Sequence, residues 1–182
     1  RFHSLGFRVA EETLALMQPA AGFTWTPPAR LHLTLRFLGD TPADRIEPLC
    51  RRLRVLRVAP FLLPVEGLGV FPPRGRPRVL WCGVGAGHPH LHQLRGQVDA
   101  AILALGLGAD LRHFTPHFTL ARLGQSVSEQ RVAQWYHAHR EFAGPPFLVE
   151  SFKLYASELQ SDGAQHTLLA EFPLSRDESG LT

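Results

Sequence analysis

Apolar and polar residues alternate along two segments of the chain, at about 30–38 and 117–123, in the pattern of a strand that buries one face. Each segment contains the same phrase of histidine, apolar residue, threonine and leucine. Successive side chains of a strand point to opposite faces, so each histidine shares a face with the threonine that follows it. These four polar residues are His32, Thr34, His117 and Thr119. The opposite face of the first strand is apolar and contains Leu31, Leu33, Leu35 and Phe37.

Turn and capping signals divide the rest of the chain into further strands and helices. The expected strands are 2–9, 61–71, 77–85, 147–157 and 166–174, and the expected helices are 11–18, 42–58, 89–105 and one that starts in the segment 126–129 and ends at about 140. Capping boxes at 41–44 and 126–129 mark the starts of two of these helices. After each histidine phrase the order is strand, glycine turn, capped helix and two strands, and the two phrases lie 85 residues apart, at 32 and 117.

This order of elements predicts an α+β fold. We expect one bilobal domain over residues 1–182, made of duplicated half-units. Two mainly antiparallel sheets, related by pseudo-two-fold symmetry, would flank a central cleft, with the helices on the outside. The two histidine strands would then face each other across the cleft.

Composition and charge narrow the class of partner. The 182 residues are 45% hydrophobic and carry a net charge of +3, and Lys153 is the only lysine among the basic residues. An arginine-rich surface suits phosphate groups, although a genome-wide preference for arginine explains the bias equally well. No apolar stretch is long enough to span a membrane, and the chain does not begin with the pattern of a secretory leader. Cys50 and Cys82 have neither metal nor redox spacing, so we expect the reducing cytoplasm as the location. We also expect a monomer that has no membrane partner.

The paired motifs resemble those of the two-histidine (2H) phosphoesterase superfamily, and within it the bacterial and archaeal RNA 2′,3′-cyclic phosphodiesterases, historically called 2′-5′ RNA ligases. The resemblance covers nearly the whole chain and extends to Leu35–Gly39, Gly69–Pro72, Val79–Trp81 and Leu154–Leu159. The first strand departs from the family pattern, because His3 and Ser4 stand where the family is usually apolar. The resemblance implies a bilobal fold with the motif strands in a water-filled cleft, and neither a metal nor another cofactor.

Hydrolysis of a cyclic phosphodiester needs a base for the attacking water, an acid for the departing ribose oxygen, and donors for the phosphate oxygens. Two imidazoles and two hydroxyls fit these roles, because imidazole titrates near neutrality. The resemblance implies that His117 is the base and His32 the acid, that Thr34 and Thr119 bind phosphate oxygens, and that Arg122 adds a positive charge. Strict alternation places Arg122 on the face opposite His117, so a bulge, a strand end or its long side chain must bring it round.

Four further residues are candidates for contact with RNA. Aromatic rings could stack a base, although on strands they are more often part of the core, and arginines in a loop could follow an RNA backbone or only be solvated. The candidates are Phe37, Trp81, Arg74 and Arg76. The three alternating histidines His88, His90 and His92 could bind a metal, but the proline between the first two and the helix expected after it favour a solvated loop, and we expect no metal site.

The sequence thus predicts an enzyme that hydrolyses RNA 2′,3′-cyclic phosphate ends to 2′-phosphates without a metal. Its partner would be RNA or a nucleotide that bears this cyclic phosphate. Three alternatives stay open: 2′-5′ RNA ligation by the reverse reaction, a non-catalytic RNA-binding module, and a zinc-dependent hydrolase.

Overall fold

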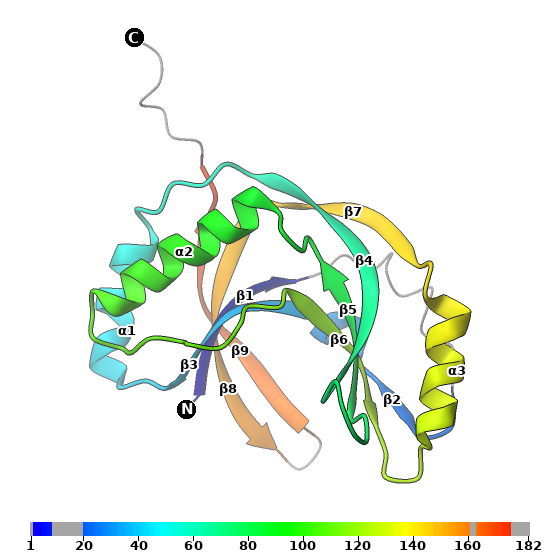
Figure 1. The fold of residues 1–182 in the computed structure, drawn as a ribbon. Coiled ribbons are helices and arrows are strands. Elements are labelled where there is room, and N and C mark those ends of the chain that lie inside the picture. The colour runs from blue at the N-terminus through cyan, green and yellow to red at the C-terminus, as the bar shows by residue number, and fades with distance from the viewer. Residues whose placement is uncertain (1, 9–19, 161–162, 176–182) are drawn as a thin grey trace.

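A computed structural model describes residues 2–8, 20–160 and 163–175. The described strands are β1 (Phe2–Arg8), β2 (Phe23–Trp25), β3 (His32–Asp40), β4 (Phe61–Phe71), β5 (Val79–Val84), β6 (His117–Leu123), β7 (Ala143–Val149), β8 (Ser151–Gln160) and β9 (Gly163–Pro173). The helices are α1 (Ala43–Leu53), α2 (Pro89–Leu103) and α3 (Glu129–His139), with a 3-10 turn at Pro28–Arg30. This composition confirms the predicted α+β class (Figure 1).

The strands form one antiparallel sheet in the order β7-β4-β5-β6-β3-β1-β8-β9, and β2 pairs with β6. β3 and β6 meet in the middle of this order, where Leu33 pairs with Phe118. We call β3, β1, β8 and β9 the β3 half of the sheet, and β6, β5, β4 and β7 the β6 half. The two sheets expected from the sequence are therefore two halves of one sheet that joins at a narrow seam. The pseudo-two-fold relation and the duplicated half-units stay predictions.

The hydrophobic core lies between the sheet and helices α1 and α2. Leu33 and Phe118 at the seam are fully buried in it, together with Leu49 of α1 and Leu94 of α2. Figure 1 shows α1 and α2 next to each other on one side and α3 on the other side of the molecule. There α3 packs on β2, with the ring of Trp135 6.0 Å from that of Trp25. The helices thus cover the apolar face of the sheet and leave the polar residues of the two motifs on its other face.

Charged side chains fasten β3 to α2 and to the loop that precedes β6. Arg36 of β3 contacts Asp99 of α2 at 3.3 Å and Asp110 of the loop at 3.8 Å. Arg95 of α2 contacts Asp99 at 2.7 Å and Asp110 at 3.4 Å, and it also donates to a backbone carbonyl of β3. The more exposed Arg112 binds Asp110 at 2.8 Å. We call these five residues the Asp110 network.

Several predicted boundaries differ from the structure. The capping box at 41–44 is wrong, because Pro42 is the N-cap of α1 and the Thr41 hydroxyl instead donates to a backbone carbonyl of β3 at 3.4 Å. α1 also ends at Leu53, five residues before the expected end. At α3 the capping residue is Ser128, whose Oγ accepts from the Arg131 amide at 3.2 Å, rather than the first serine of the expected box.

One strand, β2, was not predicted, and the strand expected at 147–157 is two strands, because its first three residues belong to β7 and the residues after Glu150 belong to β8. β7 contains two prolines, which are tolerated because this strand lies at the edge of the sheet and needs few amide donors. β2 has three residues, too few for alternation to be recognised. The helix expected at 11–18 lies outside the described residues.

Candidate active site

The seam between the two halves of the sheet brings the motif residues together. Leu33 and Phe118 pair with their side chains in the core. Alternation therefore sends the neighbouring side chains of both strands to the opposite face, where all four are half-buried: His32, Thr34, His117 and Thr119. In an antiparallel register around this pair, each histidine lies across from the threonine of the other motif. Two imidazoles and two hydroxyls from distant parts of the chain thus share one small area.

Both imidazoles are held in the same way by the backbone. His32 Nδ1 lies 2.8 Å from the Arg30 carbonyl oxygen, and His117 Nδ1 lies 2.6 Å from the Thr115 carbonyl oxygen. A carbonyl oxygen can only accept, so Nδ1 carries the hydrogen in each ring. Nε2 is then left for chemistry in both rings, with a lone pair in the neutral form and a proton in the cationic form. The anchoring prepares either histidine to act as a base or as an acid.

A β-bulge in β6 decides the position of Arg122. Leu80 pairs with Ala121, but the next residue, Trp81, pairs with Thr119, so β6 has one extra residue here. That residue, Leu120, and Ala121 are both buried, and the alternation changes phase after them. Arg122 is exposed and returns to the face that carries His117 and Thr119. Of the three ways in which Arg122 could reach the site, a bulge, a strand end or its long side chain, the structure contains the bulge.

β3 contains a bulge at the equivalent place, and it corrects the prediction for Phe37. Leu5 of β1 pairs with Arg36, but Gly6 pairs with Thr34, so Leu35 is the extra residue. Leu35 and Arg36 are both buried, whereas Phe37 is 58% exposed. The sequence placed Phe37 on the apolar face with Leu35, and that was wrong because the bulge shifts the phase. The guanidinium of Arg112 lies 5.7 Å from the Phe37 ring.

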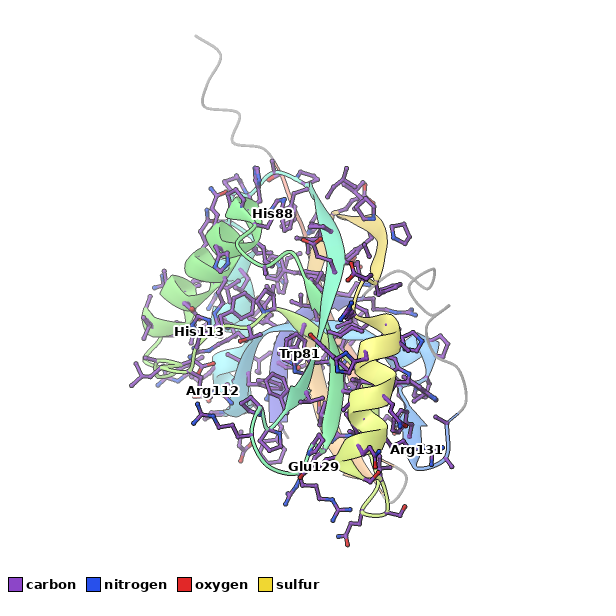
Figure 2. All side chains as sticks on the ribbon, turned by 45° about the vertical axis from the view of Figure 1, so that its right-hand side comes forward. Trp81, His88, Arg112, His113, Glu129 and Arg131 are labelled. Atoms are coloured by element: carbon purple, nitrogen blue, oxygen red, sulfur yellow. The ribbon has the colours of Figure 1, made fainter. Side chains whose placement is uncertain are left out.

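The surroundings of His117 are aromatic. Trp81 sits beside Thr119 in the sheet, and its ring stacks on that of Phe71 with 5.3 Å between centroids. The His117 ring lies 5.0 Å from Phe71 and 5.7 Å from Trp81. Gly69 makes room for this stack, because a Cβ at this position would overlap the Trp81 ring. Figure 2 shows Trp81 near the middle of the sheet.

The two loop arginines lie farther along the same half of the sheet. Arg74 and Arg76 are exposed in the loop that joins β4 to β5. β5 begins directly after this loop at Val79, which pairs with Arg122. The structure therefore places the basic loop at the Arg122 end of β6, the end away from His117.

The surroundings of His32 contain a group of residues that the sequence analysis missed. The His166 ring of β9 lies 5.0 Å from the His32 ring at an interplanar angle of 63°, and its Nδ1 lies 2.7 Å from Ser157 Oγ. The ring of Tyr155 lies 6.3 Å from the ring of His166. Burial lowers the pKa of His166, and the charges of His32 and Arg30 act in the same direction. The alternation of Lys153, Tyr155 and Ser157 signalled a polar face on β8, but nothing in the sequence placed this face near His32.

The three alternating histidines at the start of α2 contact aromatic rings of the fold. The rings of His88, the N-cap of α2, and of His90 stack on Phe61 at 5.3 and 5.8 Å, and the ring of His92 lies 5.9 Å from that of Phe114. Among the residues that the structure describes, no three His, Cys, Asp or Glu side chains are grouped so that they could hold a metal ion. None of the described helices has the length and apolar character needed to cross a membrane.

An α+β fold whose antiparallel sheet presents two His-x-Thr strands on one face is typical of a class of phosphoesterases. Comparison with known proteins places the chain in that class. The sequence profile of the family described as LigT like Phosphoesterase matches residues 8–81 and 84–164. The chain belongs to this family, which confirms the resemblance seen in the sequence.

Relatives and solved structures place the chain more closely. It is 34% identical over 175 residues to a Thermus thermophilus protein named RNA 2′,3′-cyclic phosphodiesterase, covering 93% of this chain and 84% of that one. A Geobacillus stearothermophilus protein of the same name is 35% identical over 163 residues, 87% of this chain, but the match spans only 50% of that protein. The crystal structure of TT0787 from Thermus thermophilus superposes with a TM-score of 0.79 at 28% identity, covering 98% of this chain and 100% of that one. Escherichia coli LigT in complex with 3′-AMP shares the fold, with a TM-score of 0.73 at 23% identity over 96% of this chain and 98% of that one.

Proposed function

We propose that this chain hydrolyses 2′,3′-cyclic phosphate ends of RNA to 2′-phosphates by acid–base catalysis with His32 and His117, without a metal. The observation that carries the proposal is the common placement of the two motifs. Both imidazoles lie on one face at the seam, and each is anchored through Nδ1 to a backbone carbonyl. This leaves both Nε2 atoms available to interact with one phosphate group. The family and the names of the relatives support the same reaction.

In the proposed reaction a water oxygen attacks phosphorus and the bond from phosphorus to O3′ breaks. His117 Nε2 takes the proton of the water, and His32 Nε2 gives a proton to O3′. The products are a 2′-phosphate and a free 3′-hydroxyl. The hydroxyls of Thr34 and Thr119 donate to the non-bridging oxygens, and Arg122, on the same face because of the bulge, balances their charge.

The remaining candidates would bind the nucleotide around this phosphate. The stacked rings of Phe71 and Trp81 form a surface for a base beside His117, and the exposed Phe37 offers a second ring near the other motif. Arg74 and Arg76 would contact the RNA backbone beyond Arg122.

The test is to incubate the protein with an RNA that ends in a 2′,3′-cyclic phosphate, with and without EDTA, and to identify the product. We expect a 2′-phosphate in both cases, and a loss of several orders of magnitude in turnover for His32→Ala and for His117→Ala. His137→Ala is the matched control, because this histidine is exposed on α3, outside the site. Near-normal hydrolysis by either folded site variant would refute the proposal. RNA binding without any cleavage would indicate a non-catalytic binding module instead.

A further inference from the structure

Each motif histidine has another ring packed against it in an edge-to-face arrangement. The His117 ring lies 5.0 Å from that of Phe71 at an interplanar angle of 71°, and the His32 ring lies 5.0 Å from that of His166 at 63°. Phe71 belongs to β4 and His166 to β9, so the two neighbours come from different halves of the sheet. Both imidazoles thus have two supports of the same kind, a backbone carbonyl at Nδ1 and a ring against the imidazole.

Curvature of the β3 half brings His166 to His32. β9 is separated from β3 by β1 and β8 in the sheet order, yet the two rings are in contact. The long hairpin of β8 and β9 must therefore turn over the polar face, and Figure 1 shows it running below β1 and β3. The contact is a product of the tertiary fold rather than of strand pairing.

The His166 ring is itself held in place. Ser157 pairs with His166 in the register of β8 and β9, and its Oγ lies 2.7 Å from His166 Nδ1. The ring of Tyr155 flanks the same imidazole. The His166 side chain is partly exposed and does not belong to the hydrophobic core. A line of contacts therefore runs from Ser157 through His166 to His32 without involving the core.

The ring beside His32 is uncharged under ordinary assay conditions. Partial burial lowers the pKa of His166, and the charges of His32 and Arg30 act in the same direction, so the ring is neutral at pH 7.5. Burial raises the pKa of Tyr155, so its phenol is neutral as well. His166 can thus support His32 without a positive charge that would oppose the role of His32 as an acid.

We propose that His166 is a positioning residue for His32, whose ring fixes the plane of the imidazole so that Nε2 points at the departing O3′. This inference rests on the proposed function, in which His32 gives the proton. One hydrogen bond at Nδ1 limits the motion of a ring but does not fix its plane, and a second ring against it does. Proton transfer requires Nε2 within hydrogen-bond reach of the oxygen, and a misplacement of about 1 Å costs about a hundredfold in rate.

The experiment compares three substitutions of His166 at pH 7.5 on an RNA that ends in a 2′,3′-cyclic phosphate. His166→Ala removes the ring, His166→Asn keeps a polar atom for Ser157 without a ring, and His166→Phe keeps a ring without nitrogens. We expect the alanine and asparagine variants to lower kcat about ten- to a hundredfold and to change KM less than about twofold. His166→Phe should retain most of kcat. His137→Ala, outside the site, should change neither constant.

Two further measurements separate positioning of His32 from a general effect on the fold or on substrate binding. In the His32→Ala background, His166→Ala should add less than about a twofold loss, because the residue through which it acts is gone. A substrate with sulfur in place of O3′ leaves without receiving a proton, so His166→Ala should cleave it almost as fast as the wild-type protein does.

Three outcomes would overturn the inference. They are an equal loss from His166→Ala with and without His32, an asparagine variant that is more active than the phenylalanine variant, and an equal loss on the sulfur substrate when that substrate rescues His32→Ala. If it does not rescue His32→Ala, the acid role of His32 fails, and the double-mutant comparison alone decides the inference.

If the protein cleaves no cyclic phosphate, the proposed function fails, and NMR of the His32 ring decides the inference separately. The Nδ1 hydrogen of His32, bonded to the Arg30 carbonyl, should exchange with water faster in His166→Ala than in the wild-type protein and in His137→Ala. An unchanged exchange rate would overturn the inference.

Discussion

Replacement of Asp110 by asparagine tests the charge network that fastens the two motif strands. The Asp110 side chain is 12% exposed and contacts Arg112 at 2.8 Å, Arg95 at 3.4 Å and Arg36 at 3.8 Å. The hydrogen bond from Arg112 holds the pKa of this carboxyl far below its usual range, and the charges of Arg112 and Arg36 add to the effect. Asparagine keeps the shape of the side chain and removes its charge.

The structure gives the size of the effect. Arg36 and Arg95 have side chains that are 5% and 11% exposed, and they share two carboxylates, Asp99 and Asp110. Asp110→Asn leaves these two buried guanidinium groups with only one carboxylate between them, and loss of one partner of a buried pair costs about 3–5 kcal/mol. Because Asp99 still contacts both arginines, we expect the lower end, about 3 kcal/mol. For a chain of this length that lowers Tm by about 6–12 °C.

The pH dependence provides a second check with a definite sign. The pKa of Asp110 is lower in the folded than in the unfolded protein, so its stabilisation is present above the unfolded value of about 4 and is lost as pH falls below it. The difference in stability between the protein and Asp110→Asn should therefore be full at pH 7 and shrink progressively below pH 4.

Urea unfolding at pH 7 and at pH 3 measures both effects. The matched control is Asp44→Asn, because this carboxylate is exposed in the first turn of α1, where its interaction with the helix dipole is worth about 1 kcal/mol or less. Equal stabilities of the two variants at pH 7 would refute the reasoning. So would a difference that stays constant between pH 7 and pH 3.

Three further predictions concern the site itself. Gly69→Ala should displace the Trp81 ring, shift the tryptophan fluorescence and lower the stability by about 1–3 kcal/mol in thermal unfolding, because the new methyl overlaps the indole. Arg122→Ala should lower kcat/KM by about a hundredfold for cleavage of a cyclic-phosphate RNA, and Arg122→Lys should retain part of the rate, since the charge survives without the two-pronged geometry. A substrate with sulfur in place of O3′ needs no acid, so it should restore turnover in His32→Ala and not in His117→Ala; the reverse result would exchange the two roles.

Alternation and turn residues were enough to predict much of the fold. The strands at 61–71 and 117–123 have the predicted bounds, and α2 begins at the predicted residue, because each has a strong periodic pattern with a clear start and end. The same alternation places the four polar motif residues on one face and the leucines in the core. These predictions depend only on neighbouring residues, which is the information that a sequence displays directly.

The bulges could not be located from the sequence. A bulge adds one residue and reverses the faces of all residues after it, and the pairs Leu35–Arg36 and Leu120–Ala121 carry no glycine or proline to mark it. Only the position of the neighbouring strand shows that both members of each pair are buried. For this reason the sequence misplaced Phe37 and could give only the condition under which Arg122 reaches the site.

The approach of His166 to His32 was hidden for a different reason. It depends on the curvature of a four-strand half of the sheet whose strands come from both ends of the chain. Curvature results from the summed twist of all the pairs and leaves no local pattern. The alternation of polar residues along β8 could have shown that this strand has a polar face, but not what that face meets.

The asymmetry between the two halves bears on the proposed mechanism. Each of the two imidazoles is anchored through Nδ1 to the carbonyl oxygen two residues before it, so their own hydrogen bonds do not distinguish an acid from a base. In-line displacement requires water and O3′ on opposite sides of phosphorus, so the imidazole that lies nearer O3′ must be the acid. The orientation of the bound nucleotide therefore assigns the roles. A base stacked on Phe71 and Trp81, beside His117, would fix that orientation, which makes substrate binding the source of the catalytic polarity.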